Sequence, residues 1–331
     1  MELLLNLMGV SGVSGSEEHV RELISKEIKG YVDEIKVDTS GNLIAVKKGK
    51  EPRVMLAAHM DEIGLMVKNI EDNGTIRCSA IGGIKTKSLI GQKVSIETGK
   101  EKLCGIIKRR GRKTKKDSIN NLVIQTDFSK KDLLKKGLEI GCYASFGEKP
   151  KIINNNQVKG KALDDRIGCF ALIELAKKLK KIRNEVYFVF TVQEEIGLYG
   201  AKTAAFGIQP DWAIAVDASD AKDISKSKKC LGLGPVITIK DSDFIANKCI
   251  NGWLKSIAKK NNIPLQFNVS DAGTTDATNI SLSRGGVPSS VVGVAVKDMH
   301  TGKCVASILD IENAVKLLCE LMKNPPKVCL V

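Results

Sequence analysis

Short apolar runs of strand length recur along this chain, and several of them end abruptly in acidic residues or histidine. Three such runs, each with the polar residues that come after it, are 53–58 with His59 and Asp61, 185–192 with Glu194 and Glu195, and 212–216 with Asp217. Strands that are apolar on both faces are typical of parallel sheets with both faces covered. Open sheets of this kind bind ligands at the carboxyl ends of their strands. The runs therefore predict both a fold class and the end of the sheet where chemistry takes place.

Helix-periodic segments alternate with these runs. They cover about residues 166–179, 198–206, 245–259 and 311–322, and another apolar run at 289–294 precedes the last of them. Alternation of helices with buried strands predicts an α/β fold, with a mainly parallel sheet covered by helices on both faces.

The middle of the chain has a different pattern. Between about residues 67 and 158, short alternating segments are separated by Gly, Asn and Asp, and one modest helix is expected near 130–136. This spacing favours a small β-barrel or sandwich. We therefore predict a catalytic α/β domain made of residues 1–66 plus 159–331, with an inserted β-rich domain at 67–158.

One local signal lies near the N-terminus. The segment Ser14-Gly15-Ser16-Glu17 has the S-x-x-E spacing of a capping box, and apolar residues follow it at helical spacing. The pattern predicts a helix at about 16–28, capped by Ser14 and Glu17.

Composition narrows the class of protein. The 331 residues are 43% hydrophobic and 27% charged, as in soluble globular proteins. No segment reaches the roughly 18 consecutive apolar residues of a membrane span, and the first five residues lack the basic start of a secretory signal. The nine cysteines are scattered without a C-x-x-C pair, which favours reduced thiols. We expect a cytoplasmic protein with no membrane partner.

The net charge of +14 raises the hypothesis of nucleic-acid binding, and seven basic residues fall within 108–116. However, no recognition-helix pattern accompanies them, and aromatic residues make up only 4% of the chain. A solvated basic loop is the favoured interpretation. Nucleic-acid binding stays an alternative, and binding that weakens steeply with salt would support it.

The acidic pairs and two of the three histidines point jointly to a metal. A lone histidine is more often structural than a ligand, and an acidic pair before a helix, such as Asp164-Asp165, is often an N-cap. Several buried carboxylates are costly together unless a positive charge balances them. Imidazole and carboxylate ligands without a thiolate suit zinc, cobalt or manganese. The candidate residues are His59, Asp61, Asp164, Asp165, Glu194, Glu195, Asp217 and His300.

Five motifs occur in an order that resembles the di-metal TET aminopeptidases, which form metallopeptidase family forty-two of clan MH. The motifs are Ala58-His59-Met60-Asp61-Glu62-Ile63-Gly64, Ala162-Leu163-Asp164-Asp165-Arg166-Ile167-Gly168, Thr191-Val192-Gln193-Glu194-Glu195-Ile196-Gly197-Leu198, Val216-Asp217 and Met299-His300-Thr301. The family includes glutamyl, leucyl and deblocking aminopeptidases, and some relatives have been labelled endoglucanases. Each motif is weak alone, but the set in order is highly specific.

The resemblance implies two divalent metal ions, zinc or cobalt, bridged by Asp164. His59 and Asp217 would complete one metal, and Glu195 and His300 the other. The resemblance also implies that Glu194 is the general base and acid and that Asp61 holds the His59 ring by its other nitrogen. It further implies a cis peptide bond between Asp164 and Asp165. Single positions depart from the expected pattern, such as Gly302 and Lys303 where a proline commonly follows His-Thr.

The implied activity is removal of N-terminal residues from short peptides, and the implied assembly is a homo-oligomer, a dodecameric tetrahedral shell with dimer contacts through the β-domain. A metal-dependent deacylase acting on a non-peptide amide could use the same site. A glycoside hydrolase needs only two carboxylates and would leave both histidines unexplained. A catalytically inactive assembly protein is a further alternative.

Overall fold

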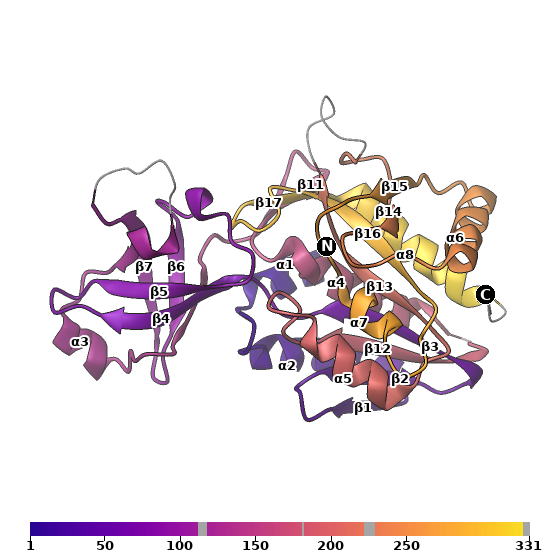
Figure 1. Ribbon diagram of the computed structural model, residues 1–331, viewed down its shortest axis with the longest axis horizontal. Helices are drawn as coiled ribbons and strands as arrows, with labels where there is room; N and C mark the ends of the chain where they lie inside the picture. The colour runs from indigo at the N-terminus through magenta and orange to yellow at the C-terminus, as the bar shows by residue number, and fades with distance from the viewer. Residues whose placement is uncertain (112–117, 181, 222–228, 327–331) are drawn as a thin grey trace.

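The computed structural model describes residues 1–111, 118–180, 182–221 and 229–326. Figure 1 shows a larger α/β part and a smaller β part that projects from one side of it. The predicted α/β fold with an inserted barrel is confirmed. Among the described residues, no helix is both long enough and apolar enough to cross a membrane.

In the described part of the chain, eleven strands form the main sheet. In spatial order the neighbouring strands are β1 (Glu34–Val37), β2 (Leu43–Lys47), β12 (Asn184–Thr191), β3 (Lys50–His59), β13 (Trp212–Ala221), β16 (Ser289–Lys297), β17 (Cys304–Ser307), β11 (Gln157–Gly160) and β10 (Lys151–Ile153). The strand β14 (Val236–Lys240) lies off this order and pairs with β16 and with β15 (Gln266–Val269). The four central strands, β12, β3, β13 and β16, are parallel to one another. The expected parallel order thus holds at the centre, whereas both margins are antiparallel.

Helices cover both faces of this sheet, because successive residues of its central strands point to opposite sides. In β3, Leu56 packs into one core and Met55 into the other. The first core also receives α1 (Glu2–Gly9), α2 (Glu18–Ile28), α4 (Leu163–Lys178), α6 (Lys248–Lys260) and α8 (Ile308–Lys323), and the second receives α5 (Tyr199–Ile208) and α7 (Asp276–Ser281).

The smaller part is a closed antiparallel barrel with an apolar core of its own. Its strands, in the order in which they pair, are β4 (Gly64–Ile70), β5 (Ile76–Ile81), β8 (Leu122–Gln125), β7 (Lys102–Arg109), β6 (Lys93–Glu97) and β9 (Tyr143–Phe146). The helix expected near 130–136 is confirmed as α3 (Lys130–Lys135). The described chain also contains the short 3-10 turns η1 (Lys29–Tyr31), η2 (Thr86–Ser88) and η3 (Ile119–Asn121). The predicted division at 67 and 158, and a role of the barrel in dimerisation, stay predictions.

Two further expectations concern the cysteines and the basic run at 108–116. Seven described cysteines carry free thiols, but Cys249 at the start of α6 is disulfide-bonded, so the expectation of reduced thiols fails there. Residues 112–116 of the basic 108–116 run lie outside the described residues.

Candidate metal centre

The predicted site residues come together at the carboxyl ends of the central strands. Because those strands are parallel, side chains that follow them converge although they are far apart in the sequence. The described residues form two groups of possible metal ligands, and within each group the ligand atoms lie within 4.8 Å of one another. The groups are His59, Glu194 and Asp217, and Asp164, Glu195 and His300.

The Asp164 carboxylate lies between the two groups. Its Oδ1 is 3.1 Å from His59 Nε2, and its Oδ2 is 3.3 Å from His300 Nε2. The peptide bond from Asp164 to Asp165 is cis, as the resemblance implied. Asp165 turns the other way, since its carboxylate accepts hydrogen bonds from the backbone N–H groups of His59 at 3.3 Å and Gly168 at 2.9 Å. Of the two adjacent acids, Asp165 anchors the start of α4 and Asp164 faces both imidazoles.

The two imidazoles have similar surroundings. His59 Nε2 lies 3.8 Å from Glu194 Oε2 and 3.8 Å from Asp217 Oδ1. His300 Nε2 lies 3.7 Å from Glu195 Oε2. On the opposite side of each ring, Nδ1 lies 3.0 Å from a backbone carbonyl oxygen, that of Asp61 for His59 and that of Gly83 for His300. Because a carbonyl only accepts, Nδ1 carries a hydrogen, so the ring can offer a lone pair to a cation only at Nε2, once Nε2 has lost its own proton.

Asp61 is fully buried and holds several parts of the site at once. Its carboxylate accepts the backbone N–H of Glu194 at 3.0 Å, the backbone N–H of Glu195 at 3.1 Å and the hydroxyl of Ser14 at 2.6 Å. Its Oδ1 also lies 3.4 Å from His59 Nδ1. The position of the Glu194-Glu195 turn relative to His59 therefore depends on one carboxylate.

The acids of the site have perturbed proton affinities. Burial raises the pKa of Glu194 and Asp217 well above their usual range, and it raises the pKa of Glu195 to about 8, with repulsion from Asp164 adding to the shift. The pKa of His300 rises to about 9, chiefly because of its hydrogen bond to Asp164. Hydrogen bonds from both imidazoles outweigh burial and lower the pKa of Asp164. Without added positive charge, these carboxylates cannot all be ionised.

The donor set fits two divalent cations. Each group combines imidazole nitrogen with carboxylate oxygen, as zinc and cobalt sites do. Cations would also balance the excess of buried negative charge. All five predicted ligands, Asp61 and Glu194 thus lie together, while the role of each stays a prediction.

Sequence reasoning missed several residues that hold the site. The capping-box interpretation is wrong: Ser14 donates to Asp61, and the Glu17 carboxylate accepts the backbone N–H groups of Gly15 at 2.8 Å and Gln193 at 3.2 Å. The helix α2 begins after Glu17 without a side-chain cap. Hydroxyl and carboxylate groups at this spacing can serve a helix end or a distant loop, and the sequence does not distinguish the two.

Asp276, at the start of α7, is a further missed acid. It accepts a hydrogen bond from the Thr191 hydroxyl at 2.5 Å, its other oxygen is buried without a hydrogen-bond partner, and burial raises its pKa to about 6. No apolar strand directly precedes Asp276 in the sequence, so the pattern that pointed to the other acids does not point to it.

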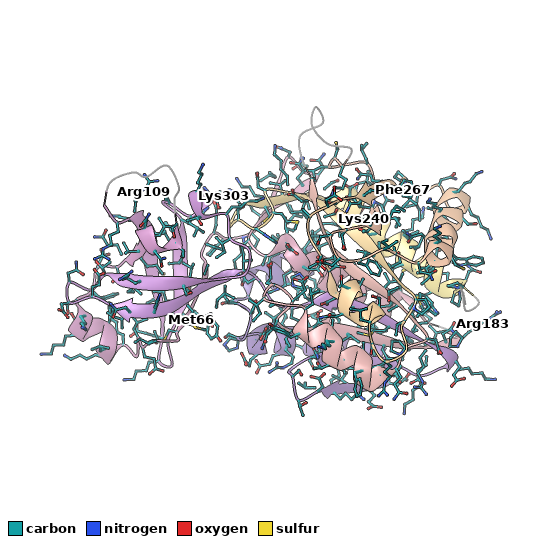
Figure 2. The ribbon with its side chains drawn as sticks, viewed as in Figure 1. Met66, Arg109, Arg183, Lys240, Phe267 and Lys303 are labelled. Carbon is teal, nitrogen blue, oxygen red and sulfur yellow. The ribbon has the colours of Figure 1, made fainter. Side chains whose placement is uncertain are left out.

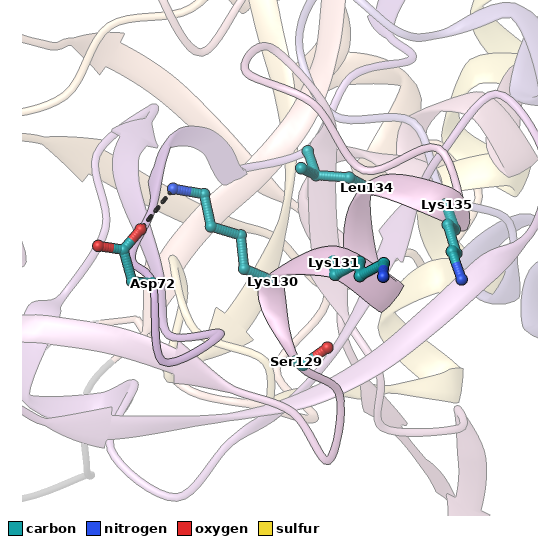
Figure 3. Close-up of a pocket in the computed structure, with 6 residues that line it drawn as sticks. All are labelled: Asp72, Ser129, Lys130, Lys131, Leu134 and Lys135. Carbon is teal, nitrogen blue, oxygen red and sulfur yellow. Dashed lines mark hydrogen bonds and ion pairs between the residues drawn. The ribbon is translucent and has the colours of Figure 1, made fainter.

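Cavities adjoin the centre. One of about 280 Å³ is lined by Asp164, Glu194, Glu195, Asp217 and His300 among others. A second cavity, of about 430 Å³, adjoins the first, and both are lined by Ala218, Gly273, Thr274, Met299 and His300. A third, of about 670 Å³, lies apart at α3 on the barrel (Figure 3) and contains none of the site residues.

The fold and the site define an α/β metallohydrolase with two adjoining candidate metal-binding groups at the carboxyl ends of parallel strands. More narrowly, the chain belongs to the M42 peptidase family, because residues 41–317 match the family described as M42 glutamyl aminopeptidase. It is accordingly a metallo-aminopeptidase that acts on peptide bonds and removes N-terminal residues.

Similar proteins span nearly the whole chain. A protein of Acetivibrio thermocellus is 45% identical over 326 residues, 96% of this chain and 97% of that protein. The lysyl aminopeptidase of Pyrococcus furiosus is 35% identical over 339 residues, 98% and 96% of the two chains. A structure of PhTET1, with a dodecamer in the asymmetric unit, superposes with a TM-score of 0.90 at 35% identity and covers 97% of this chain and 98% of its own.

Proposed function

We propose that this aminopeptidase trims short peptides in the cytoplasm with two divalent metal ions, zinc or cobalt. Asp164 would be shared by the two ions, His59 and Asp217 would hold one, and Glu195 and His300 would hold the other. Glu194 is the general base and acid. The observation that carries this proposal is the Asp164 carboxylate, which directs one oxygen at each imidazole.

Bound ions would supply positive charge that favours deprotonation of water and stabilises negative charge on the peptide carbonyl oxygen. Glu194 takes the proton of the attacking water and passes it to the leaving amine. Its neighbours support that task, since burial and the nearby acids raise its affinity for a proton. Asp61 positions it through the backbone N–H groups of Glu194 and Glu195.

The proposal is tested with a panel of substrates. Leu-, Glu- and Lys-p-nitroanilides, short peptides and their N-acetylated forms are offered to the protein before and after chelation, and again after zinc or cobalt is restored. We expect cleavage of substrates with a free amino terminus, loss of activity with chelator and recovery with metal. Cleavage of N-blocked amides alone would instead support the deacylase, and metal-bound protein that is inert toward all peptides would refute the proposal.

We further propose that the chain forms a homo-oligomer through its own exposed apolar side chains. Ile196, Tyr199, Phe206 and Leu282 are 43%, 54%, 58% and 73% exposed and lie on or beside α5 and α7. Exposed apolar residues that cluster in this way are typical of interaction surfaces. Assembly into a dodecamer, as in PhTET1, would cover them.

A further inference from the structure

The barrel reaches into the metal centre through the loop between β5 and β6. Gly83 of this loop lines the 280 Å³ cavity together with the acids of the site. Lys85 lines the adjoining 430 Å³ cavity, and its backbone N–H points to the carbonyl oxygen of His300 at 3.5 Å. One wall of the centre therefore comes from a different part of the molecule than the other walls.

The loop also determines how the His300 ring is held. His300 Nδ1 donates to the Gly83 carbonyl at 3.0 Å, which leaves Nε2 directed at Asp164 and Glu195. The corresponding contact of His59 is made within its own segment, by Asp61. His300 is 30% exposed whereas His59 is 2% exposed, so packing restrains His300 less and its hydrogen bonds matter more.

Glycines at the contact make the close approach possible. A Cβ on Gly83 would lie 3.0 Å from His300 Nδ1 and 3.2 Å from its Cε1, and one on Gly82 would lie 3.1 Å from Glu195 Oε2. The segment after His300 is packed against the barrel as well, since a Cβ on Gly302 would lie 3.2 Å from Phe146. Lys303, labelled in Figure 2, lies where this segment meets the barrel.

The geometry points to the barrel as a positioning element for one of the two metals. Gly83 orients His300, so the placement of the barrel against the α/β part determines how tightly the Asp164–Glu195–His300 group binds its ion. The His59 group binds its ion independently of the barrel. This inference rests on the proposed metal centre and adds a dependence of one metal on a residue outside the ligand set.

Gly83→Ala tests the inference, with Gly99→Ala as its matched control. Gly99 lies in the turn between β6 and β7 of the same barrel, and a Cβ there would meet nothing within 4 Å. Purified holoprotein is stripped with chelator and titrated with Co²⁺, and bound metal is counted after dialysis. In Gly83→Ala the backbone carbonyl stays, but the new Cβ would lie 3.0 Å from His300 Nδ1 and would push the ring away from its hydrogen bond. We therefore expect one ion to bind as in the wild type and the second to bind about 10–100-fold more weakly, as when the contact that orients a ligand is disturbed. Gly99→Ala should bind both ions like the wild type.

Equal binding of both ions in Gly83→Ala and the wild type would overturn the inference, and so would equal weakening of both ions. A wild-type protein that binds fewer than two ions would overturn it as well. Failure of the proposed function looks different: the wild type would bind two ions normally and cleave no peptide.

A second measurement uses the unaltered protein in case Gly83→Ala does not fold. The chain has three histidines, His19, His59 and His300, so ¹⁵N-histidine spectra of the zinc-loaded protein are simple to assign. We expect the His300 ring to carry its hydrogen on Nδ1, bonded to Gly83. A His300 ring with its hydrogen on Nε2 would contradict the proposed contact.

Discussion

Glu194 and Glu195 are neighbours in the chain but face different imidazoles, Glu194 toward His59 and Glu195 toward His300. Both backbone N–H groups are bonded to Asp61, so the turn that carries them has little freedom. Adjacent carboxylates can therefore take different roles, with one at the metal and one moving a proton.

Glu194→Gln is predicted to lose activity without losing metal. Glutamine keeps the size of the side chain but cannot take a proton from water, so kcat should fall by about 10²–10⁴-fold. Steady-state kinetics and elemental analysis of dialysed protein measure the two properties separately. Turnover like that of the wild type would show that another group is the base.

Asp61→Asn is predicted to damage both metal binding and activity. Asp61 accepts hydrogen bonds on both of its oxygens, and an asparagine would present an N–H₂ group to one of the donors. We expect a loss of about 10–100-fold in metal affinity or in kcat/KM. Ser14→Ala removes only one of these hydrogen bonds and should have a smaller effect. If Asp61→Asn behaves like the wild type in both assays, Asp61 is not a positioning residue.

Glu17 is predicted to make stability depend on pH. Burial raises its pKa from 4.5 to about 7. Because the folded state then binds a proton that the unfolded state releases, the contribution is complete below about pH 4.5 and is lost as pH rises through about 7. Metal-free wild type should lose stability relative to Glu17→Gln between about pH 5 and 8, on the order of 2 kcal/mol. Urea unfolding of both proteins across this range measures the difference, and a constant difference would contradict the assignment.

At the scale of elements, the start of α4 is packed too closely to accept a larger side chain. A Cβ on Gly168 would lie 2.3 Å from Asp165 Oδ2 and 2.7 Å from the carbonyl oxygen of Val216 in β13. The same helix start carries Asp164, so the packing of α4 against the sheet places the Asp164 carboxylate between the two imidazoles.

Gly168→Ala is therefore predicted to destabilise the protein by about 1–3 kcal/mol, as overpacking does. Gly252→Ala in α6 is the control, because a Cβ there meets nothing within 4 Å and alanine is favoured in helices by up to about 1 kcal/mol. Urea unfolding of the metal-free variants compares them. A stabilising effect of both substitutions would refute the close packing at Gly168.

The strands that sequence patterns missed are short and lack a regular apolar pattern. The central runs and the barrel segments are long or regular enough to be recognised. By contrast β10, β11, β14, β15 and β17 have three to five residues each. Short strands with mixed polarity are paired by their neighbours in space more than by their own pattern.

At the scale of the whole molecule, the barrel lies beside the α/β part (Figure 1). The two parts meet at the metal centre through the contact between Gly83 and His300. Each part has its own apolar core. Contacts between them, such as Tyr143 of β9 with the carbonyl oxygen of Gly15 at 3.2 Å, lie close to the residues that hold the site. A change in the position of the barrel relative to the α/β part should therefore alter the geometry of the metal centre first.

The assembly leads to a last prediction. Light scattering of the purified protein should give a particle of many 35.8 kDa chains, twelve if it resembles PhTET1. Leu282→Asp should reduce the particle to smaller species, because it places a charge on a side chain that assembly would bury. A wild-type monomer at micromolar concentration would contradict the proposal.

The sequence by itself determined the apolar strands, the acids and histidines that follow them and their order, since these depend on local pattern and on motifs read along the chain. Only the tertiary structure decided which of two adjacent acids meets which partner, that Ser14 and Glu17 support the site and do not cap a helix, and that a barrel carbonyl holds His300. The physical reason is that each of these contacts joins residues distant in sequence. The hydrogen-bond partner of a polar side chain depends on which segments the packed strands and helices bring close to it. The local sequence pattern does not contain that information.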